Sequence, residues 1–263
     1  MYTIDDIKVT LLNGDEVKNF IFNHGSIACV CYNTPKKFAN KVGESCLVEG
    51  HTSGSRGDYF KFEIVCPRFC ADQIMRHFIG TFYNCQSQRY VDMDDDFSIY
   101  VPPTVLNDES IVNSYALYER QCKEMYKVVR NQMDDLGIKG EKANDLMRTM
   151  LPIGVKTKLV AGFDIEALIH FCHKRLCVRA DLPIRKVAEM MRDLVIAIEP
   201  RYADLLVPQC RNLLYCPEKH GCKMYPSKEE VQNLIKLGKD CCKNNPLDEF
   251  CNGDCSNCNK CNK

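Results

Sequence analysis

The sequence of 263 residues predicts one α+β domain followed by a cysteine-rich C-terminal extension. Short β-branched or alternating segments lie in the first quarter of the chain, and long stretches with helical spacing follow after residue 107. A chain of this length can bury a sizeable core. We place the domain at residues 1–225 and the extension at residues 226–263.

Three segments of the first quarter predict strands. Residues 7–12 are β-branched and end at an Asn-Gly turn signal. Residues 26–32 indicate either a second strand or the start of a helix that follows the first strand. Residues 59–65 alternate apolar and polar side chains, which is typical of a half-buried strand, and Pro67 ends it.

A helix is predicted over residues 70–80, where Ile74, Phe78 and Ile79 have helical spacing. This helix delivers the stretch 76–90 at its C-terminal end. Because functional groups are often presented by loops on rigid elements, we expect this stretch to be part of a site.

Four longer helices follow in the second half of the domain. They are predicted at 107–135, at 142–150 before a Leu-Pro pair, at 164–178, and from Pro183 until just before a second proline at position 200.

The stretch 76–90, RHFIGTFYNCQSQRY, combines fixed charge, hydrogen-bonding groups and aromatic rings. Guanidinium and amide groups hold anionic, polar ligands, and a flat ligand ring can stack on aromatic side chains. The pattern therefore indicates a nucleotide-like ligand, and a solvated loop is the alternative. The sequence contains no glycine-rich phosphate-binding motif, so side chains and helix ends would hold such a ligand.

Cys85 lies in the same stretch, with Arg76, His77 and Arg89 close in sequence. Nearby positive charge lowers the pKa of a thiol, so Cys85 is a candidate thiolate nucleophile. The alternative is a small filler beside a ligand.

The helix predicted at 164–178 carries Arg175 and, one turn later, Arg179, neither with an acid four residues away. Such guanidinium groups suit phosphate or carboxylate recognition, and surface arginines are the alternative. The same helix has side chains of metal-ligand type, which a polar stripe explains equally well: Glu166, His170, His173 and Cys177.

The chain has 18 cysteines, and nine of them fall in residues 210–261. Without a signal peptide, reduced thiols are favoured over a disulfide scaffold. The last four have spacings that suit a zinc or iron–sulfur site, and a disordered reactive tail is the alternative. They are Cys251, Cys255, Cys258 and Cys261.

Basic and acidic residues number 35 each, so the formal net charge is zero. This balance argues against a protein that coats nucleic acid. The start of the sequence has no apolar signal segment, and no apolar run reaches the length of a membrane span. We therefore expect a cytoplasmic protein without a membrane or nucleic-acid partner.

With these positions in hand, the chain resembles the flavin-dependent thymidylate synthases over roughly residues 5–222. The family signature is RHRxxSxNExSxRY, and the chain follows it if one extra residue is allowed in the middle. The matching residues are Arg76, His77, Thr81, Asn84, Ser87, Arg89 and Tyr90. Outside the signature, the match includes His51, Gln73, Arg148 before Leu-Pro, and Arg175.

The resemblance implies a mostly antiparallel sheet packed by long helices, and a homotetramer whose active sites form between subunits. Each site would hold FAD and convert a small pyrimidine deoxynucleotide, dUMP, to dTMP. Methylenetetrahydrofolate would supply the methylene group, and NADPH would reduce the flavin. Because this chemistry needs no protein nucleophile on the pyrimidine, the protein contributes positioning and electrostatics.

The resemblance also implies roles for individual residues. Around the nucleotide it places Gln73, Arg76, Cys85, Gln86, Ser87, Gln88, Arg89, Arg148 and Arg175. Facing the flavin it places His51, Arg76, His77, Thr81, Asn84 and His170. The catalytic candidates are Arg175, Ser87 and Cys85, and Arg175 would stabilise enolate-like charge as it develops at the base.

The chain departs from the family at several of these positions. Phe78 replaces the second arginine of the signature, and Cys85 replaces its glutamate. In the late helix, Asp164, Glu166 and His170 stand where the family has asparagine, arginine and asparagine. Two alternatives therefore stay open: a flavin enzyme that methylates or hydroxymethylates another pyrimidine nucleotide such as dCMP, and a non-enzymatic metal- or nucleotide-binding relative.

Overall fold

The structure is a computed structural model that describes residues 1–93 and 97–242, with the backbone alone for 237–242. The chain divides into two compact units, one of residues Met1–Val207 and a second that begins at Pro208. The predicted metal ligands, Cys251, Cys255, Cys258 and Cys261, lie outside the described residues. In the part of the chain that is described, every helix is too short or too polar to span a lipid bilayer.

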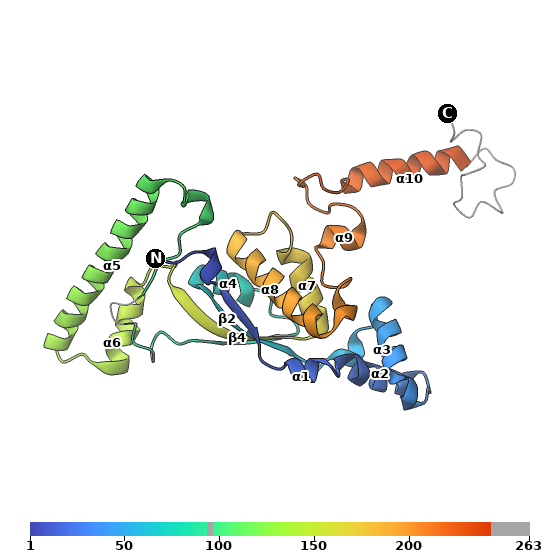
Figure 1. Cartoon of the computed structure of the whole chain (residues 1–263), viewed down its shortest axis with the longest axis horizontal. Coiled ribbons are helices and arrows are strands. Elements are labelled where there is room, and N and C mark those ends of the chain that lie inside the picture. The colour runs from blue at the N-terminus through green and yellow to red at the C-terminus, as the bar shows by residue number, and fades with distance from the viewer. Residues whose placement is uncertain (94–96, 243–263) are drawn as a thin grey trace. The chain divides into compact units, whose positions relative to one another are not determined.

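A four-stranded antiparallel sheet forms the centre of the first unit (Figure 1). Its strands are β1 (Lys8–Leu11), β2 (Phe60–Pro67), β3 (Thr81–Cys85) and β4 (Lys156–Phe163). They lie in the order β1-β2-β4-β3, so β4 pairs with both β2 and β3. The α+β class and the antiparallel sheet are confirmed, and the strands expected at 7–12 and 59–65 correspond to β1 and β2.

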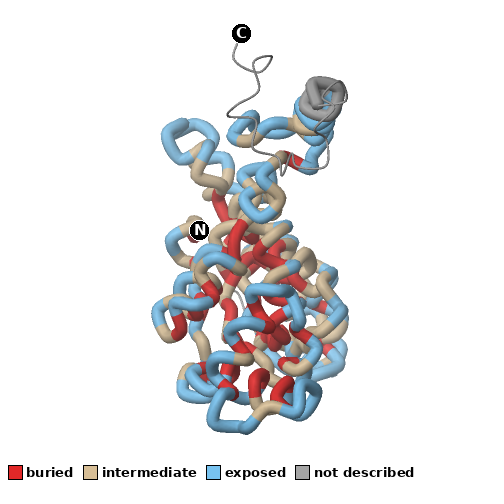
Figure 2. The backbone as a smooth tube through the Cα atoms, turned by 90° about the vertical axis from the view of Figure 1, so that its right-hand side faces the viewer, coloured by how far each residue is buried: buried red, intermediate tan, exposed pale blue. Residues whose placement is uncertain are grey.

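Helices α4 (Arg68–Met75), α7 (Ile165–Arg175) and α8 (Leu182–Ile198) pack with the sheet around the main hydrophobic core. Alternate side chains of β2 are fully buried in this core. They are Phe60, Phe62, Ile64 and Cys66. Figure 2 shows the buried backbone running through the interior of the unit with exposed segments around it.

Helices α2 (Phe20–Cys31) and α3 (Ala39–Val48) cross closely at Gly25 and Gly43. A Cβ on Gly25 would meet the backbone of the facing helix. Of the two interpretations of residues 26–32, the helix is confirmed and the strand is wrong, because residues 26–31 continue α2. Tertiary packing of the helix against its neighbour outweighs the β-branched composition.

Helices α5 (Glu109–Asp135) and α6 (Gly140–Met147) form a hairpin that is seen at the left of Figure 1. They confirm the two amphipathic helices predicted in this region, although the second ends in a 3₁₀ turn, Arg148–Met150. The side chain of Asp108 caps α5. A second small core of buried side chains belongs to this region, namely Phe97, Tyr126, Met147 and Val155.

Two predicted helix ends differ from the structure near the cavity described below, and one strand there was not predicted. The helix expected over 70–80 ends at Met75, and Phe78 and Ile79 are 77% and 80% exposed. The chain then turns at Gly80, whose φ is +69°, and enters β3, a strand that the sequence did not predict. The helix expected over 164–178 ends at Arg175, whereas α8 begins as predicted beside Pro183.

The second unit contains α9 (Gln209–Leu213) and α10 (Lys228–Cys242) within its described residues. Cys216 and Ser227 form an isolated parallel bridge. Ser227 Oγ accepts from the backbone N–H of Glu230 at 3.2 Å, and the Glu230 carboxylate accepts from the Ser227 N–H at 2.6 Å. This reciprocal capping begins α10. A domain boundary at residue 225 stays a prediction.

Candidate active site

A cavity of about 460 Å³ lies in the first unit between the loop 76–80 and α7. Thr81 Oγ1 donates to the His77 carbonyl at 2.6 Å, and the Tyr83 hydroxyl donates to the same oxygen. Since β3 holds the loop through both hydroxyls, the loop presents its side chains in a fixed arrangement. The residues that line the cavity are Arg76, His77, Phe78, Ile79, Gly80, Asp164, Glu166, Ala167, His170 and Arg175.

The two walls of the cavity meet where Gly80 contacts Asp164. The Asp164 N–H donates to the Gly80 carbonyl at 2.9 Å, and a Cβ on Gly80 would meet the Asp164 carboxylate. The same carboxylate accepts from the Ala167 N–H at 2.8 Å and so caps α7. Asp164 is therefore a buried structural acid that begins α7 and fixes the turn at Gly80.

Arg175 and His77 form the central polar contact of the cavity. Arg175 Nε donates to His77 Nε2 at 3.0 Å, which assigns the proton of the neutral ring to Nδ1. The ring packs edge to face against Phe171 and His170, with centroids 5.0 and 5.7 Å apart. Burial, with the charge of Arg175, lowers the pKa of His77 to about 4. His77 is therefore a neutral acceptor at pH 7.

Arg175 is half-buried at the end of α7 and engages this neutral imidazole rather than a carboxylate. Burial, followed by the charge of Arg76, lowers the pKa of Arg175. A guanidinium stays charged at neutral pH even so. The guanidinium groups of Arg76 and Arg175 thus lie close together, a pair that suits an anionic group, within a lining that also contains the carboxylates of Asp164 and Glu166.

Glu166 lines the cavity and connects it to the loop 50–59. Its carboxylate accepts a hydrogen bond from Thr52 Oγ1, and Arg56 Nη2 lies 3.3 Å from Oε2. His51 belongs to the same loop but does not line the cavity. Its Nδ1 lies 3.2 Å from the Tyr32 hydroxyl, and its side chain is exposed.

Of the residues that the sequence assigned to a site, the structure brings Arg76, His77, His170 and Arg175 together at the cavity. Thr81 supports the loop through the hydrogen bond from its hydroxyl to the His77 carbonyl. Gln73 lies on α4, partly buried, two residues before that helix ends.

A second group of predicted residues gathers around carboxylates of α6. Arg89 Nε and Arg148 Nη2 each lie 3.1 Å from Asp145, and Arg89 also pairs with Glu141 at 3.0 Å. Ser87 Oγ accepts from the Arg89 N–H at 3.3 Å. These residues do not line the cavity, so the sequence-predicted nucleotide residues fall into two separate groups.

Cys85, at the end of β3, lies beside a cation that the sequence analysis missed. Its Sγ is 3.5 Å from Arg68 Nη1 and 3.7 Å from Thr157 Oγ1. Arg68 also pairs with Asp72 at 3.0 Å. The thiol is thus held between a charge and a hydroxyl, away from the cavity lining.

The remaining predicted residues follow the same strand. Asn84 is exposed on β3, and the Gln86 N–H donates to the Lys158 carbonyl at 2.8 Å, which extends the pairing with β4. Gln88 lies in the turn that follows.

The metal face considered for the late helix is not supported by the structure. Cys177 lies beyond the end of α7, as does Arg179, because the helix is shorter than predicted. Among the side chains that the structure describes, in residues 1–93 and 97–236, no three His, Cys, Asp or Glu come together as a metal site.

Comparisons with known proteins agree with the fold and with the signature. Residues 24–201 match the sequence model of a family described as thymidylate synthase complementing protein. The flavin-dependent thymidylate synthase of Nitratidesulfovibrio vulgaris is 30% identical over 190 residues, covering 71% of this chain and 77% of that protein. The enzyme of the same name from Pyrococcus abyssi is 35% identical over 178 residues, covering 65% of this chain and 69% of that protein.

A solved structure shares the fold. The UMP/dUMP methylase PolB from Streptomyces cacaoi, bound with 5-Br dUMP, superposes with a TM-score of 0.58 at 19% identity, covering 78% of this chain and 96% of that one. The family resemblance inferred from the signature is confirmed by the relatives and by the family match. The chain therefore belongs to the thymidylate synthase complementing protein family and is an enzyme of the flavin-dependent thymidylate synthase type.

Proposed function

We propose that this enzyme catalyses the reductive methylation of dUMP to dTMP with a bound FAD. Methylenetetrahydrofolate supplies the one-carbon group and NADPH the reducing equivalents. The names of the relatives and the ligand of the PolB structure support this reaction class. The observation that carries it is the pair of guanidinium groups, Arg76 and Arg175, at a cavity that also contains the neutral His77.

The residues of the cavity fit a flavin nucleotide. Arg76 supplies positive charge for phosphate groups, and the exposed side chains of Phe78 and Ile79 offer an apolar wall for a flat ring system. The rings of His77 and His170, with centroids 5.7 Å apart, both line the cavity. When bound, the flavin supplies the redox chemistry of the reaction.

Arg175 is the candidate for stabilising charge on the pyrimidine. Its guanidinium is half-buried, so its field is screened less than that of a surface arginine. The hydrogen bond to His77 orients the group through Nε and leaves the fork of the two terminal nitrogens for a ligand oxygen. Because His77 is neutral, it holds Arg175 without cancelling its charge.

The second group of predicted residues, Arg89 and Arg148 with Ser87, suits the phosphate and sugar of the nucleotide. In one chain this group gathers around Asp145 and Glu141 instead of lining the cavity. We propose that the enzyme is a homotetramer in which these residues of one subunit complete the site of another. Sedimentation of the flavin-bound protein tests this assembly.

The substrate is tested by tritium release from C5-labelled dUMP, dCMP and UMP, each with methylenetetrahydrofolate and NADPH. UMP is included because PolB is a UMP/dUMP methylase. We expect release from dUMP in the fraction with a flavin spectrum. Turnover of dCMP alone would show that the departures at Cys85 and Phe78 have changed the substrate. A colourless protein with bound zinc would instead indicate the non-enzymatic relative.

A further inference from the structure

Arg56 reaches the lining of the cavity from a loop that is remote from it in sequence. Arg56 Nη2 lies 3.3 Å from Glu166 Oε2, and these side chains are 69% and 43% exposed. An exposed pair of this kind contributes little to stability. The pair matters instead because it places the positive charge of Arg56 at the edge of a cavity that suits anions.

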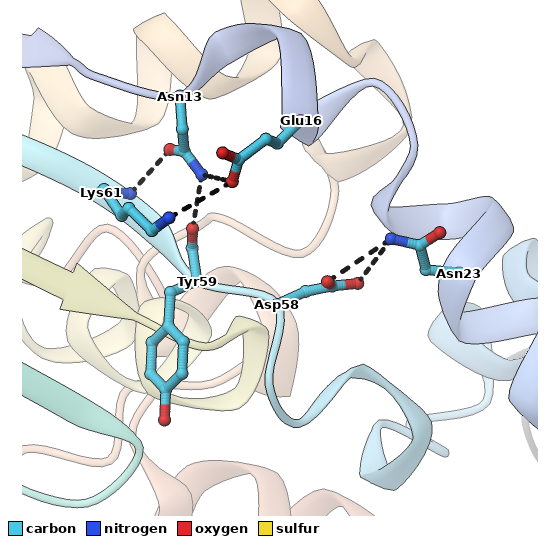
Figure 3. Close-up of polar contacts among 6 residues, drawn as sticks. All are labelled: Asn13, Glu16, Asn23, Asp58, Tyr59 and Lys61. Atoms are coloured by element: carbon cyan, nitrogen blue, oxygen red, sulfur yellow. Dashed lines mark hydrogen bonds and ion pairs between the residues drawn. The ribbon is translucent and has the colours of Figure 1, made fainter.

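The loop that carries Arg56 is anchored on its C-terminal side, as Figure 3 shows. Asn13 Nδ2 donates to the Tyr59 carbonyl at 2.8 Å, and Asn23 Nδ2 donates to the Asp58 carboxylate at 3.2 Å. Asn13 is itself buried, so the first contact is shielded from water. The backbone of the loop is thereby tied to the start of α1 (Gly14–Val17) and to α2.

The N-terminal side of the loop is anchored as well. Thr52 is buried and its hydroxyl donates to Glu166, while Ser55 Oγ donates to the Thr52 carbonyl at 2.6 Å. Arg56 therefore starts from a backbone held on both sides. A guanidinium that is placed in advance loses less conformational entropy when it binds a ligand.

Arg56 also decides the sign of the fixed charge at the cavity. Leaving the histidines aside, the lining contains two guanidinium groups, Arg76 and Arg175, and two carboxylates, Asp164 and Glu166, so the formal charges cancel. Asp164 is buried and faces the N-terminus of its own helix. Glu166 is the carboxylate that a ligand would meet, and Arg56 neutralises it and makes the sum positive.

We propose that Arg56, positioned by Glu166 and Thr52, is a binding residue for the phosphate groups of the flavin nucleotide. Glu166 stands where the resembled family has arginine, and Arg56 brings a guanidinium to Glu166 from the neighbouring loop. This inference rests on the proposed function, because it takes the ligand to be a flavin nucleotide.

The test is a titration of the full chain with FAD, FMN and riboflavin, followed by flavin fluorescence. A charge-assisted contact with a phosphate contributes about 1.5–3 kcal/mol, so Arg56→Ala should weaken FAD and FMN binding by about 10- to 100-fold. Riboflavin, which has no phosphate, should bind within about threefold of the wild type. Arg56→Lys, which keeps the charge without the fork, should fall between the two.

Arg120→Ala is the matched control. Arg120 is also 69% exposed and pairs with a carboxylate, Glu124, at 3.8 Å on α5. We expect this variant to bind all three flavins as the wild type does. Any general effect of removing an exposed arginine would appear here as well.

The charge exchange gives a second readout. Arg56→Glu should bind FAD more weakly than Arg56→Ala, and the double variant Arg56→Glu with Glu166→Arg should recover most of the lost affinity. Equal FAD binding by wild type and Arg56→Ala would overturn this inference and leave the proposed function standing. So would an equal loss of riboflavin binding, since it would show a damaged cavity. A wild-type chain that binds no flavin would overturn both.

Discussion

Arg175 Nε donates to His77 Nε2 at 3.0 Å and thereby joins two elements that lie 98 positions apart in the sequence. The last residue of α7 and the loop after α4 fix each other at this contact. Since one partner is a charged donor and the other a neutral acceptor, changes to either should have separable effects on stability and on turnover.

His77 should make the stability of the protein depend on pH. Its pKa is about 4 in the folded state, against about 6.5 in an unfolded chain. Between these values the unfolded state binds more protons, so the free energy of unfolding falls as the pH is lowered from about 6.5 to 4. His77→Asn keeps an acceptor for Arg175 but does not titrate. From pH 7 to pH 4.5, we expect wild type to lose about 2 kcal/mol more than this variant.

Urea unfolding at fixed protein concentration measures this difference. Burial also lowers the pKa values of His24 and His173, but both residues remain in the variant, so their contributions cancel in the comparison. The same pH dependence in both proteins would contradict a neutral, buried His77.

Arg175→Ala should lower turnover sharply while leaving the flavin bound. Removing a positioned donor to developing charge typically lowers kcat by about 100- to 1,000-fold. Arg175→Lys should be nearly as impaired, because lysine cannot reproduce the guanidinium fork. Turnover and the flavin spectrum are measured on the same samples, with Arg120→Ala as the control. Activity near that of the wild type would remove Arg175 from the site.

Cys85→Ser should be mild. Its Sγ contacts Arg68 and Thr157, and a serine hydroxyl can bond to both. We expect kcat within about threefold of wild type, because a reaction without a protein nucleophile needs only the shape and polarity at this position. A variant that binds flavin and nucleotide normally but does not turn over would instead identify Cys85 as a covalent nucleophile.

Gly80→Ala should destabilise the first unit by more than its backbone conformation alone explains. Gly80 has φ of +69°, and an added Cβ would meet the Asp164 carboxylate. Gly137 is the control, since its φ is +73° and nothing lies within 4 Å of an added Cβ. We expect about 1 kcal/mol for Gly137→Ala and 2–4 kcal/mol for Gly80→Ala in urea unfolding. Equal losses would show that Asp164 moves aside without cost.

The sequence predicted the elements whose own pattern is strong. Helices α5 and α8 and strand β2 follow from regular spacing of apolar side chains. Strand β3 lies inside a polar stretch, and it is a strand because β4 pairs with it. In β4, buried and exposed positions alternate at first, and burial then becomes continuous toward Phe163. The alternating pattern that indicates a strand is therefore weaker in β4 than in β2.

The same distinction holds for the site. Arg175 was a candidate from its residue type and helical position, and the signature identified Arg76 and His77. The contacts of Glu166 with Thr52 and Arg56 span 114 and 110 positions in the sequence, so a pattern of neighbouring residues cannot predict them. Gly80 had a visible signal as a glycine after a helix, yet its contact with Asp164 depends on the sheet register.

The position of β4 in the middle of the sheet has a consequence for synthesis on the ribosome. Thr81 pairs with Phe163, which at about 5–20 residues per second is added on the order of 4–16 s later. During that interval β3 has no strand to pair with, and the loop before it lacks the Asp164 contact. Flavin capture should therefore begin only after α7 has left the exit tunnel, so a nascent chain stalled before that point should not bind the cofactor.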